Sequence, residues 1–231
     1  MEQSNIIVRV ASSADFKYAS IISDEMAASA QARGTGIAKR SAEYIQQKME
    51  EGKAVIAVTT EGDWVGFCYI EAWSESAYVA NSGLIVSPAF RKTGIAKQIK
   101  KRIFDLSREK YPTAKIFGLT TGLAVMKINS DLGYEPVTYS ELTDDENFWA
   151  GCKSCVNYDI LMSKDRKNCL CTAMLYDPKD HYEPTETAAA FQKNKKTYER
   201  LLQFKQYWLS KFQKGRKSDK SRSLLSYFFN L

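Results

Sequence analysis

A short glycine-containing turn near the middle of the chain carries the residue types that bind anions. It follows a buried apolar run, precedes a helical pattern, and consists of Arg91, Lys92, Thr93, Gly94, Ile95 and Ala96. The first amides of a helix have no acceptor inside the helix, and the helix dipole adds partial positive charge there. Gly94 has no Cβ, so a ligand can approach its backbone closely. The turn is therefore predicted to bind a phosphate or a pyrophosphate.

This turn matches neither the G-x-x-x-x-G-K-S/T loop nor the G-x-G-x-x-G fingerprint. It resembles the acyl-CoA loop of the GNAT superfamily of N-acetyltransferases, whose pattern is Arg/Gln-x-x-Gly-x-Gly/Ala, and the Val86-x-Pro88 lead-in strengthens the likeness. The resemblance implies acetyl-CoA or another short acyl-CoA such as succinyl-CoA as donor. Its pyrophosphate would lie on residues 91–96 and its pantetheine arm beside Leu84, Ile85 and Val86. The alternative is an ordinary strand-to-helix turn with a solvated basic pair.

The same resemblance implies direct attack of an amine on the thioester, with a base to take the proton of the amine. Glu71, near the end of a predicted strand, is the candidate base, and a surface glutamate bonded to a neighbour is the alternative. In the family a tyrosine serves as general acid, and Asn129 occupies its place within residues 128–133. An amide can donate a hydrogen bond but cannot protonate a thiolate. The sequence therefore does not identify the general acid. Tyr134 is an alternative for it, but this tyrosine fits core packing better.

A glycine-containing basic segment lies where the first two helices of the family meet over the acceptor site. Its cations are Arg33, Lys39 and Arg40, and arginine can grip a carboxylate with two hydrogen bonds. We expect them to bind the acceptor, the α-amine of a small acidic amino acid such as glutamate. The alternative is a solvated loop between helices.

Four of the five cysteines lie close together, as Cys152-x-x-Cys155 and Cys169-x-Cys171. In a cytosolic chain such clustering favours metal over disulfides, and four thiolates would form a closed structural zinc site. Reduced buried thiols and an iron–sulfur cluster are the alternatives. Cys68 lies in an apolar strand and is predicted to be core, whereas His181 is predicted to lie at the surface.

The composition describes a globular protein with a basic tail. The 231 residues carry a net charge of +6. Residues 193–222 hold eleven Lys or Arg against two acidic residues, a local +9, which leaves about −3 elsewhere. No apolar run reaches the ~20 residues of a membrane span, and no signal peptide is visible, so we expect a cytoplasmic protein. The tail also carries an apolar helical stripe, which is predicted to pack on the body or to form a homodimer. Binding to an anionic membrane surface or to nucleic acid is the alternative, and no nucleic-acid partner is expected.

The periodicity predicts an α/β (α+β) protein with a central mixed sheet of six to seven strands flanked by helices. Strands are predicted at residues 6–10, 54–59, 64–73, 78–87, 115–121, from 134 onward and at 171–176. Helices are predicted at residues 12–34, 41–51, 94–106 and 124–132. This is the element order of the GNAT fold. We expect a core at residues 1–145, a Cys-rich segment with the last strand at 146–178, and a basic helical extension at 179–231.

Within the superfamily the chain more loosely resembles bacterial N-acetylglutamate synthase-like N-acyltransferases linked to arginine biosynthesis. Residues 33–40, 118–123 and 148–178 carry this likeness. It implies transfer of an acetyl or succinyl group to glutamate or a similar amino acid. There are two alternative hypotheses. The protein acylates a peptide or lysine amine, or it is a regulator that binds acyl-CoA without catalysis.

Overall fold

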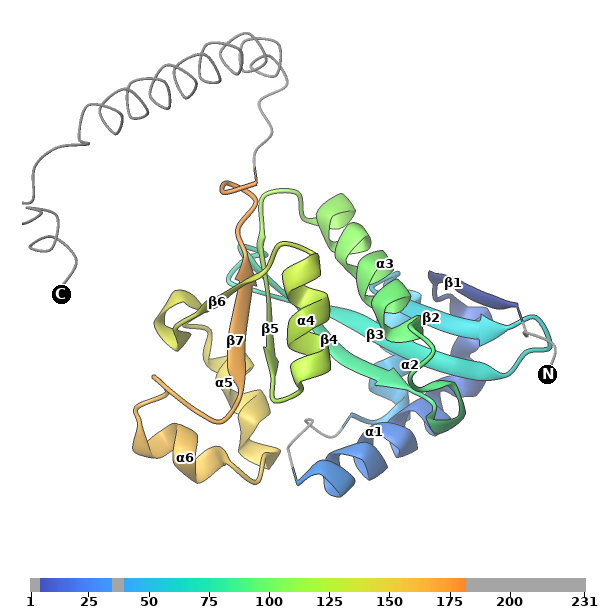
Figure 1. The fold of residues 1–231 in the computed structure, drawn as a ribbon, viewed down its shortest axis with the longest axis horizontal. Helices are drawn as coiled ribbons and strands as arrows, with labels where there is room; N and C mark the ends of the chain where they lie inside the picture. Colours follow the sequence, from blue (N-terminus) through green and yellow to red (C-terminus); the bar gives the residue numbers. More distant parts are fainter. Residues whose placement is uncertain (1–4, 35–39, 182–231) are drawn as a thin grey trace, which may run out of the picture. The chain divides into compact units, whose positions relative to one another are not determined.

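A seven-stranded sheet forms the centre of the protein (Figure 1). The computed structural model describes residues 5–34 and 40–181. Its strands are β1 (Ile6–Val10), β2 (Ala54–Thr59), β3 (Trp64–Trp73), β4 (Tyr78–Val86), β5 (Lys115–Thr120), β6 (Glu135–Val137) and β7 (Thr172–Tyr176). They lie in the order β1-β2-β3-β4-β5-β7-β6, and β4–β5 is the one parallel pair among the paired strands described. The predicted mixed sheet flanked by helices is confirmed.

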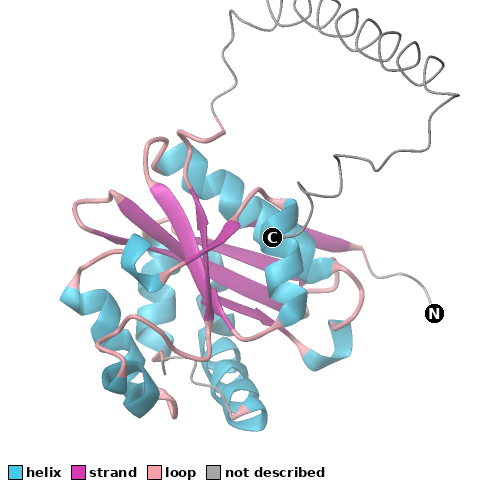
Figure 2. Cartoon of the chain, turned by 60° about the vertical axis from the view of Figure 1, so that its left-hand side comes forward, coloured by secondary structure: helices cyan, strands magenta, loops and turns pink. Residues whose placement is uncertain are grey.

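Helices cover both faces of the sheet (Figure 2). They are α1 (Ala19–Arg33), α2 (Ala42–Glu50), α3 (Ile95–Lys110), α4 (Leu123–Asp131), α5 (Glu146–Ala150) and α6 (Tyr158–Ser163). Short 3-10 turns lie at η1 (Ser13–Tyr18), η2 (Pro88–Phe90), η3 (Tyr139–Glu141) and η4 (Gly151–Ser154). None of the helices among the described residues is long and apolar enough to cross a membrane.

The alternation of side chains along each strand explains the layers. Val55 and Ala57 of β2 pack in one core with α3, whereas Ala54 and Ile56 pack in a second core with α1 and α2. Successive residues of a strand point to opposite faces, so a strand buried on both faces reads as a continuous apolar run. The α3 helix therefore covers one face, and α1 and α2 cover the other.

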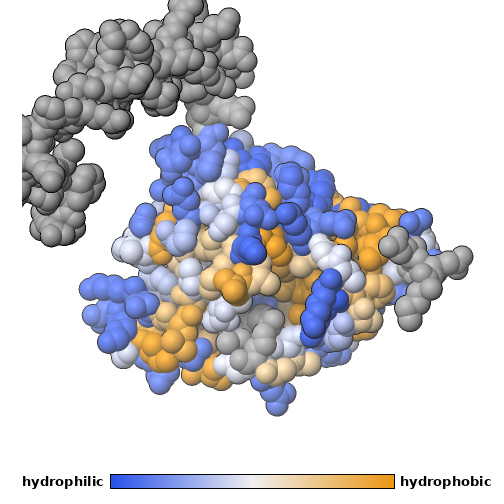
Figure 3. All heavy atoms as spheres, viewed as in Figure 1, coloured by the Kyte–Doolittle hydropathy of each residue, from blue (hydrophilic) through white to orange (hydrophobic). Residues whose placement is uncertain are grey.

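The predicted apolar stripe of α3 is buried. Ile95, Ile99, Ile103 and Leu106 all lie in the first core, one helical turn apart. The outward side of α3 carries Lys and Arg side chains, and it lies in the hydrophilic upper part of the described body in Figure 3. An amphipathic helix with one apolar face is the sequence signature of this packing.

A third core lies under α5 and α6, at the β5–β7 end of the sheet. Phe117 of β5 is fully buried there, and its ring centroid lies 5.1 Å from that of Phe148. Ile116, the residue before it, faces α3 instead. The α5 and α6 helices thus share a sheet face with α1 and α2 but cover its other half (Figure 1). The sequence predicted no helices here, because five- and six-residue helices show no clear period.

Two predictions need qualification. The helix predicted over residues 12–34 is a 3-10 turn followed by α1, and Ser12 with Asp15 forms the predicted capping box before it. The predicted tail and homodimer concern residues 182–231, which lie outside the described residues.

Candidate active site

The sheet opens between β4 and β5. The two strands pair over three residues, ending at Ala80 and Phe117. Beyond them β5 continues to pair with β7 as far as Thr120, while β4 continues to pair with β3 as far as Val86. The strands therefore diverge and leave part of the β4 edge without a strand partner on that side.

A β-bulge lies on β4 beside this opening. Phe67 pairs with Ile85 and Tyr69 with Ser82, so Gly83 and Leu84 together lie opposite Cys68. Gly83 adopts φ +64°, and a Cβ at this position would lie 2.3 Å from Cε1 of Tyr69. Only glycine fits this conformation and this space. Bulges interrupt the hydrogen-bond ladder, so backbone groups of β4 are available beside the opening.

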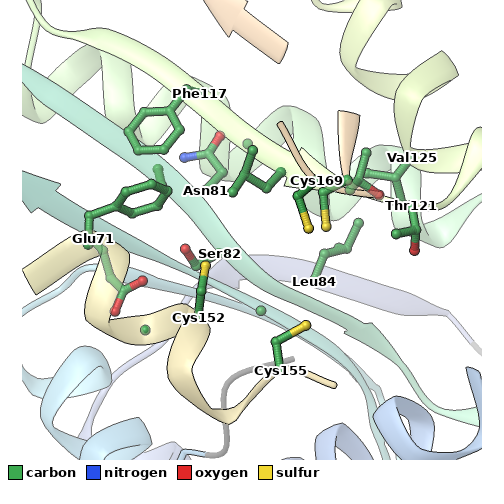
Figure 4. Close-up of a pocket in the computed structure, with 18 of the residues that line it drawn as sticks. Glu71, Asn81, Ser82, Leu84, Phe117, Thr121, Val125, Cys152, Cys155 and Cys169 are labelled. Carbon is green, nitrogen blue, oxygen red and sulfur yellow. The ribbon is translucent and has the colours of Figure 1, made fainter. Parts of the chain in front are cut away.

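A cavity of about 640 Å³ runs through the opening from one sheet face to the other. On the α1/α2 side it is lined by Arg40, Tyr44, Tyr69 and Glu71, together with residues of η4 and α6. On the α3/α4 side it is lined by Lys100, Val125 and Asn129. Figure 4 shows Glu71 and three cysteine side chains around this cavity, with Ser82 and Leu84 of β4 beside them.

Glu71 lies in a network of hydrogen bonds on the α1/α2 side. Its Oε1 accepts from Tyr44 Oη and from Arg40 Nη2, the latter at 3.1 Å. Arg40 Nε donates to Tyr69 Oη at 2.9 Å. Glu71 Oε2 accepts no hydrogen bond from residues 5–34 or 40–181. One oxygen is thus held in place and the other is available to a ligand.

The protonation states in this network follow from burial and charge. Burial first, and then the Glu71 carboxylate, raises the pKa of Tyr44. Burial and Glu71 likewise raise the pKa of Tyr69. Burial alone would lower the pKa of Arg40, but Tyr69 and Glu71 outweigh it and raise that pKa. At neutral pH both tyrosine hydroxyls are therefore neutral, Tyr44 donates to Glu71, Tyr69 accepts from Arg40, and Arg40 is charged.

On the α3/α4 side, Asn129 Oδ1 and Lys100 Nζ have no hydrogen-bond partner within the described chain. Asn129 is 1% exposed, its Oδ1 accepts no hydrogen bond, and its Nδ2 contacts Met174 Sδ at 3.7 Å. Lys100 is 2% exposed and lies over the Tyr134 ring, with Nζ 5.4 Å from the centroid. Tyr134 itself bonds Asn81 in the core, as its predicted packing requires. Sequence reasoning missed Lys100, although its place next to the apolar stripe of α3 was a usable signal.

The predicted anion turn has the geometry of an open nest. Lys92 adopts φ 65° and Gly94 adopts φ 87°. The amides of Lys92, Thr93 and Gly94 donate to no acceptor within the described part of the chain. Successive free amides in such a turn form an anion-binding concavity. A Cβ on Gly94 would meet no atom within 4 Å, so glycine is needed here for its φ angle rather than for space.

The side chain of Arg91 points away from this nest toward α1. Its Nη2 donates to Glu25 Oε1 at 2.6 Å and to Ser29 Oγ at 3.0 Å, and its Nε donates to Val86 O at 3.1 Å. These bonds connect the end of β4 with α1. Arg91 therefore shapes the turn, while the backbone amides supply its free donors.

The predicted zinc site is not supported. Among residues 5–34 and 40–181, no group of three or more His, Cys, Asp or Glu is arranged to hold a metal ion. Instead Cys152, Cys155, Cys169 and Cys171 line the cavity. Burial raises the pKa of Cys152 to about 11 and that of Cys171 to about 12, so these are protonated thiols at neutral pH. Clustering in sequence could not reveal that the thiols face a cavity and do not converge on one point.

The predicted acceptor-binding residues fall in different places. Arg40 lines the cavity next to Glu71. Arg33 ends α1, but its side chain, like all of Lys39, lies outside the description. Cys68 is buried and His181 is exposed, as predicted.

Comparison with known proteins identifies the fold. No family model matches the sequence, and no curated protein matches it. Among solved structures, N-acetylglutamate synthase from Neisseria gonorrhoeae, complexed with coenzyme A and N-acetyl-glutamate, superposes with a TM-score of 0.53 at 16% identity over 76% of this chain. A Mycobacterium tuberculosis protein, Rv2747, solved with CoA, gives 0.51 at 18% identity over 74% of this chain and 98% of its own. A Salmonella typhimurium protein, yncA, solved with acetyl-CoA as cofactor, gives 0.52 at 16% identity over 79% of this chain and 99% of its own.

The chain has the GNAT fold. The match spans only 36% of the Neisseria synthase, so this chain corresponds to about a third of that protein. The opened β4–β5 pair, the β4 bulge and the turn before α3 are the parts of this GNAT fold that form the candidate site.

Proposed function

We propose that the protein is an acyl-CoA-dependent N-acyltransferase. The observation that carries this proposal is the cavity through the opened sheet, with the free amides of the nest at the start of α3. A CoA pyrophosphate on Lys92, Thr93 and Gly94 would direct the pantetheine arm along Leu84, Ile85 and Val86. The thioester would then lie where β4 and β5 diverge.

The chemistry is direct transfer from sulfur to nitrogen. A neutral amine attacks the thioester carbon, a C–N bond forms, and the C–S bond breaks as the CoA thiolate leaves. Glu71 Oε2 receives the proton that the amine loses, while Tyr44 and Arg40 hold Oε1 in place. A backbone amide at the β4 bulge can stabilise the oxyanion that develops on the carbonyl oxygen.

The acceptor is the α-amine of a free amino acid. Arg40 and Glu71 place a guanidinium and a carboxylate side by side in the cavity, at 3.1 Å. This pair of opposite charges complements the carboxylate and the amine of an amino acid. Glutamate is the first candidate, because the sequence carries two further cations, Arg33 and Lys39, close to Arg40 along the chain. Glutamate would connect the protein with arginine biosynthesis, and we expect the reaction in the cytoplasm because its substrates are metabolites.

A thiol-release screen tests this function. Several acyl-CoAs are combined with free amino acids and with lysine-containing peptides, and glutamate with acetyl-CoA is expected to give the highest rate. Faster release with peptides would favour a peptide acyltransferase. Binding of CoA without turnover on any amine would favour a regulator.

The CoA site is tested by Arg91→Glu. The change removes the bonds from Arg91 to Glu25 and Ser29 that hold the turn, and it adds negative charge beside the nest, so CoA affinity is expected to fall at least about tenfold when measured by calorimetry. Lys101→Glu is the matched control, because it makes the same charge change on the exposed side of α3. Equal affinity of both variants would show that the nucleotide binds elsewhere.

A further inference from the structure

We propose that Lys100 protonates the CoA thiolate as it leaves, in place of the tyrosine that this chain lacks at Asn129. This inference rests on the proposed acyltransferase function and adds a residue to its site. It assigns the proton donor that the sequence left open.

The position of Lys100 supports this role. It projects from α3 into the cavity, on the sheet face opposite Glu71. An amine that enters from the Glu71 side would expel the thiolate toward the α3/α4 side. Lys100 of α3 and Asn129 of α4 line the cavity there, as does Asn81 of β4, whose amide is already bonded to Ser107 and Tyr134.

Within the described residues, the surroundings of Lys100 contain no charged partner for its side chain. Its Nζ makes no ion pair or hydrogen bond within residues 5–34 and 40–181, and its neighbours are the Tyr134 ring and the Cys68 thiol. A buried lysine without a charged partner is less favourable for the fold than an apolar side chain of similar size. Asn129 Oδ1 beside the same cavity is also without a partner. Two such groups on one wall point to a ligand that carries polar atoms.

The proton transfer balances. The C–S bond breaks with its electron pair on sulfur, and the sulfur takes a proton from the Lys100 ammonium to give the CoA thiol and a neutral amine. Lys100 regains its proton from solvent after the products leave. Burial lowers the pKa of Lys100, which makes its ammonium a stronger acid than that of an exposed lysine. Cys68, whose pKa burial raises to about 11, and Tyr134, whose pKa burial also raises, are both neutral at neutral pH.

The decisive variant is Lys100→Met, with Lys101→Met as the matched control on the exposed side of the same helix. Lys100→Met is expected to melt at a higher temperature than the parent and yet to turn over about 100-fold more slowly. The parent should also lose rate at alkaline pH as Lys100 deprotonates, whereas Lys100→Met should not. A residue that only supports the fold would lose stability and rate together. Lys100→Gln serves the same comparison if the Met variant does not fold.

A measurement on bound CoA separates this role from the function on which it rests. The thiolate absorbance of bound CoA is followed against pH, and the pKa of its thiol is expected to be at least one unit higher in Lys100→Met than in the parent. If the parent binds and turns over acyl-CoA, but Lys100→Met has the same rate and the same thiol pKa as the parent, the role of Lys100 is wrong while the function stands. If the parent binds no CoA, both proposals fall.

Discussion

The two carboxylate oxygens of Glu71 have different environments. Tyr44 and Arg40 both donate to its Oε1, and Oε2 is left to the cavity. A fixed carboxylate with one free oxygen suits a base, because its orientation costs no entropy during reaction. The Glu71–Arg40 pair also places both charges in the cavity, which suits an acceptor that carries an α-amine and an α-carboxylate.

At this scale we predict the effect of Glu71→Gln. The rate should fall about 100-fold at neutral pH and recover as pH rises, because an amine that is already deprotonated in solution needs no base. The pH dependence of kcat/KM checks this. Tyr44→Phe is the control, since it removes one hydrogen bond and keeps the carboxylate. A Glu71→Gln rate within about twofold of the parent at neutral pH would exclude Glu71 from proton transfer.

Among the elements, β4 has the largest influence on the site. It pairs with β3 along its whole length, with β5 over only three residues, and carries the bulge at Gly83. The α3 helix that follows places the nest at one end of the cavity and Lys100 in its wall. The site therefore forms where β4 diverges from β5 and where α3 begins.

Gly83→Ala should disturb this strand. The added methyl would lie 2.3 Å from Tyr69 Cε1, at a φ that L-residues rarely adopt, so we expect a loss of about 2–3 kcal/mol in the free energy of unfolding. Gly118→Ala on β5 is the control, because its nearest contact is Asn129 Nδ2 at 3.8 Å. Denaturant unfolding measures both. Equal stabilities of the two variants would mean that the bulge does not need glycine.

The start of the first helical segment provides a pH-dependent contribution to stability. Buried Asp15 accepts two hydrogen bonds from Arg9, at 2.7 and 2.8 Å, and one from Ser12 N at 2.9 Å. Burial alone would raise the pKa of Asp15, but these hydrogen bonds outweigh it and lower the pKa. The stability that this carboxylate contributes is therefore present above its unfolded pKa of about 3.9 and is lost as pH falls through the lower folded pKa.

Asp15→Asn should consequently cost about 2 kcal/mol at neutral pH, and the difference from the parent should shrink toward pH 3 or so. Thermal unfolding at several pH values measures this difference. Asp24→Asn, at an exposed position of α1, is the control and should change stability by less than about 0.5 kcal/mol. A difference that stays constant with pH would contradict the role of the charge.

At the scale of the whole molecule, residues 1–181 form one compact unit, and residues 182–231 are grouped separately. The cavity and the nest lie within the first unit. We predict that a chain ending at residue 181 unfolds cooperatively and binds CoA within about twofold of the full chain, because the three cores that support the site are complete.

Calorimetric unfolding and CoA titration of both lengths check this prediction. Measurement at two salt concentrations adds a test of the basic tail, since a contribution from its charge would weaken with salt. If the shorter chain keeps its fold but loses CoA binding, residues 182–231 contribute to the CoA site and the prediction is wrong.

The sequence by itself determined most local features of this protein. The apolar period placed α3 and its buried face, the β-branched runs placed β2 to β5, and the glycine before α3 marked the nest, because each of these depends on neighbours along the chain. The family resemblance added the fold. Only tertiary structure decided the opening between β4 and β5, since strand pairing depends on the register of distant segments.

Tertiary structure also decided which side chains meet. Glu71 joins Tyr44 and Arg40 from 27 and 31 residues away, and no periodic pattern encodes such contacts. The four cysteines are close in sequence and yet line a cavity, because Cys152 and Cys155 lie in and just after η4 whereas Cys169 and Cys171 lie between α6 and β7. Lys100 gained its place in the cavity wall only when the strands beneath α3 separated. Local order is set by adjacent residues, whereas a site is set by the long-range packing that brings separate segments together.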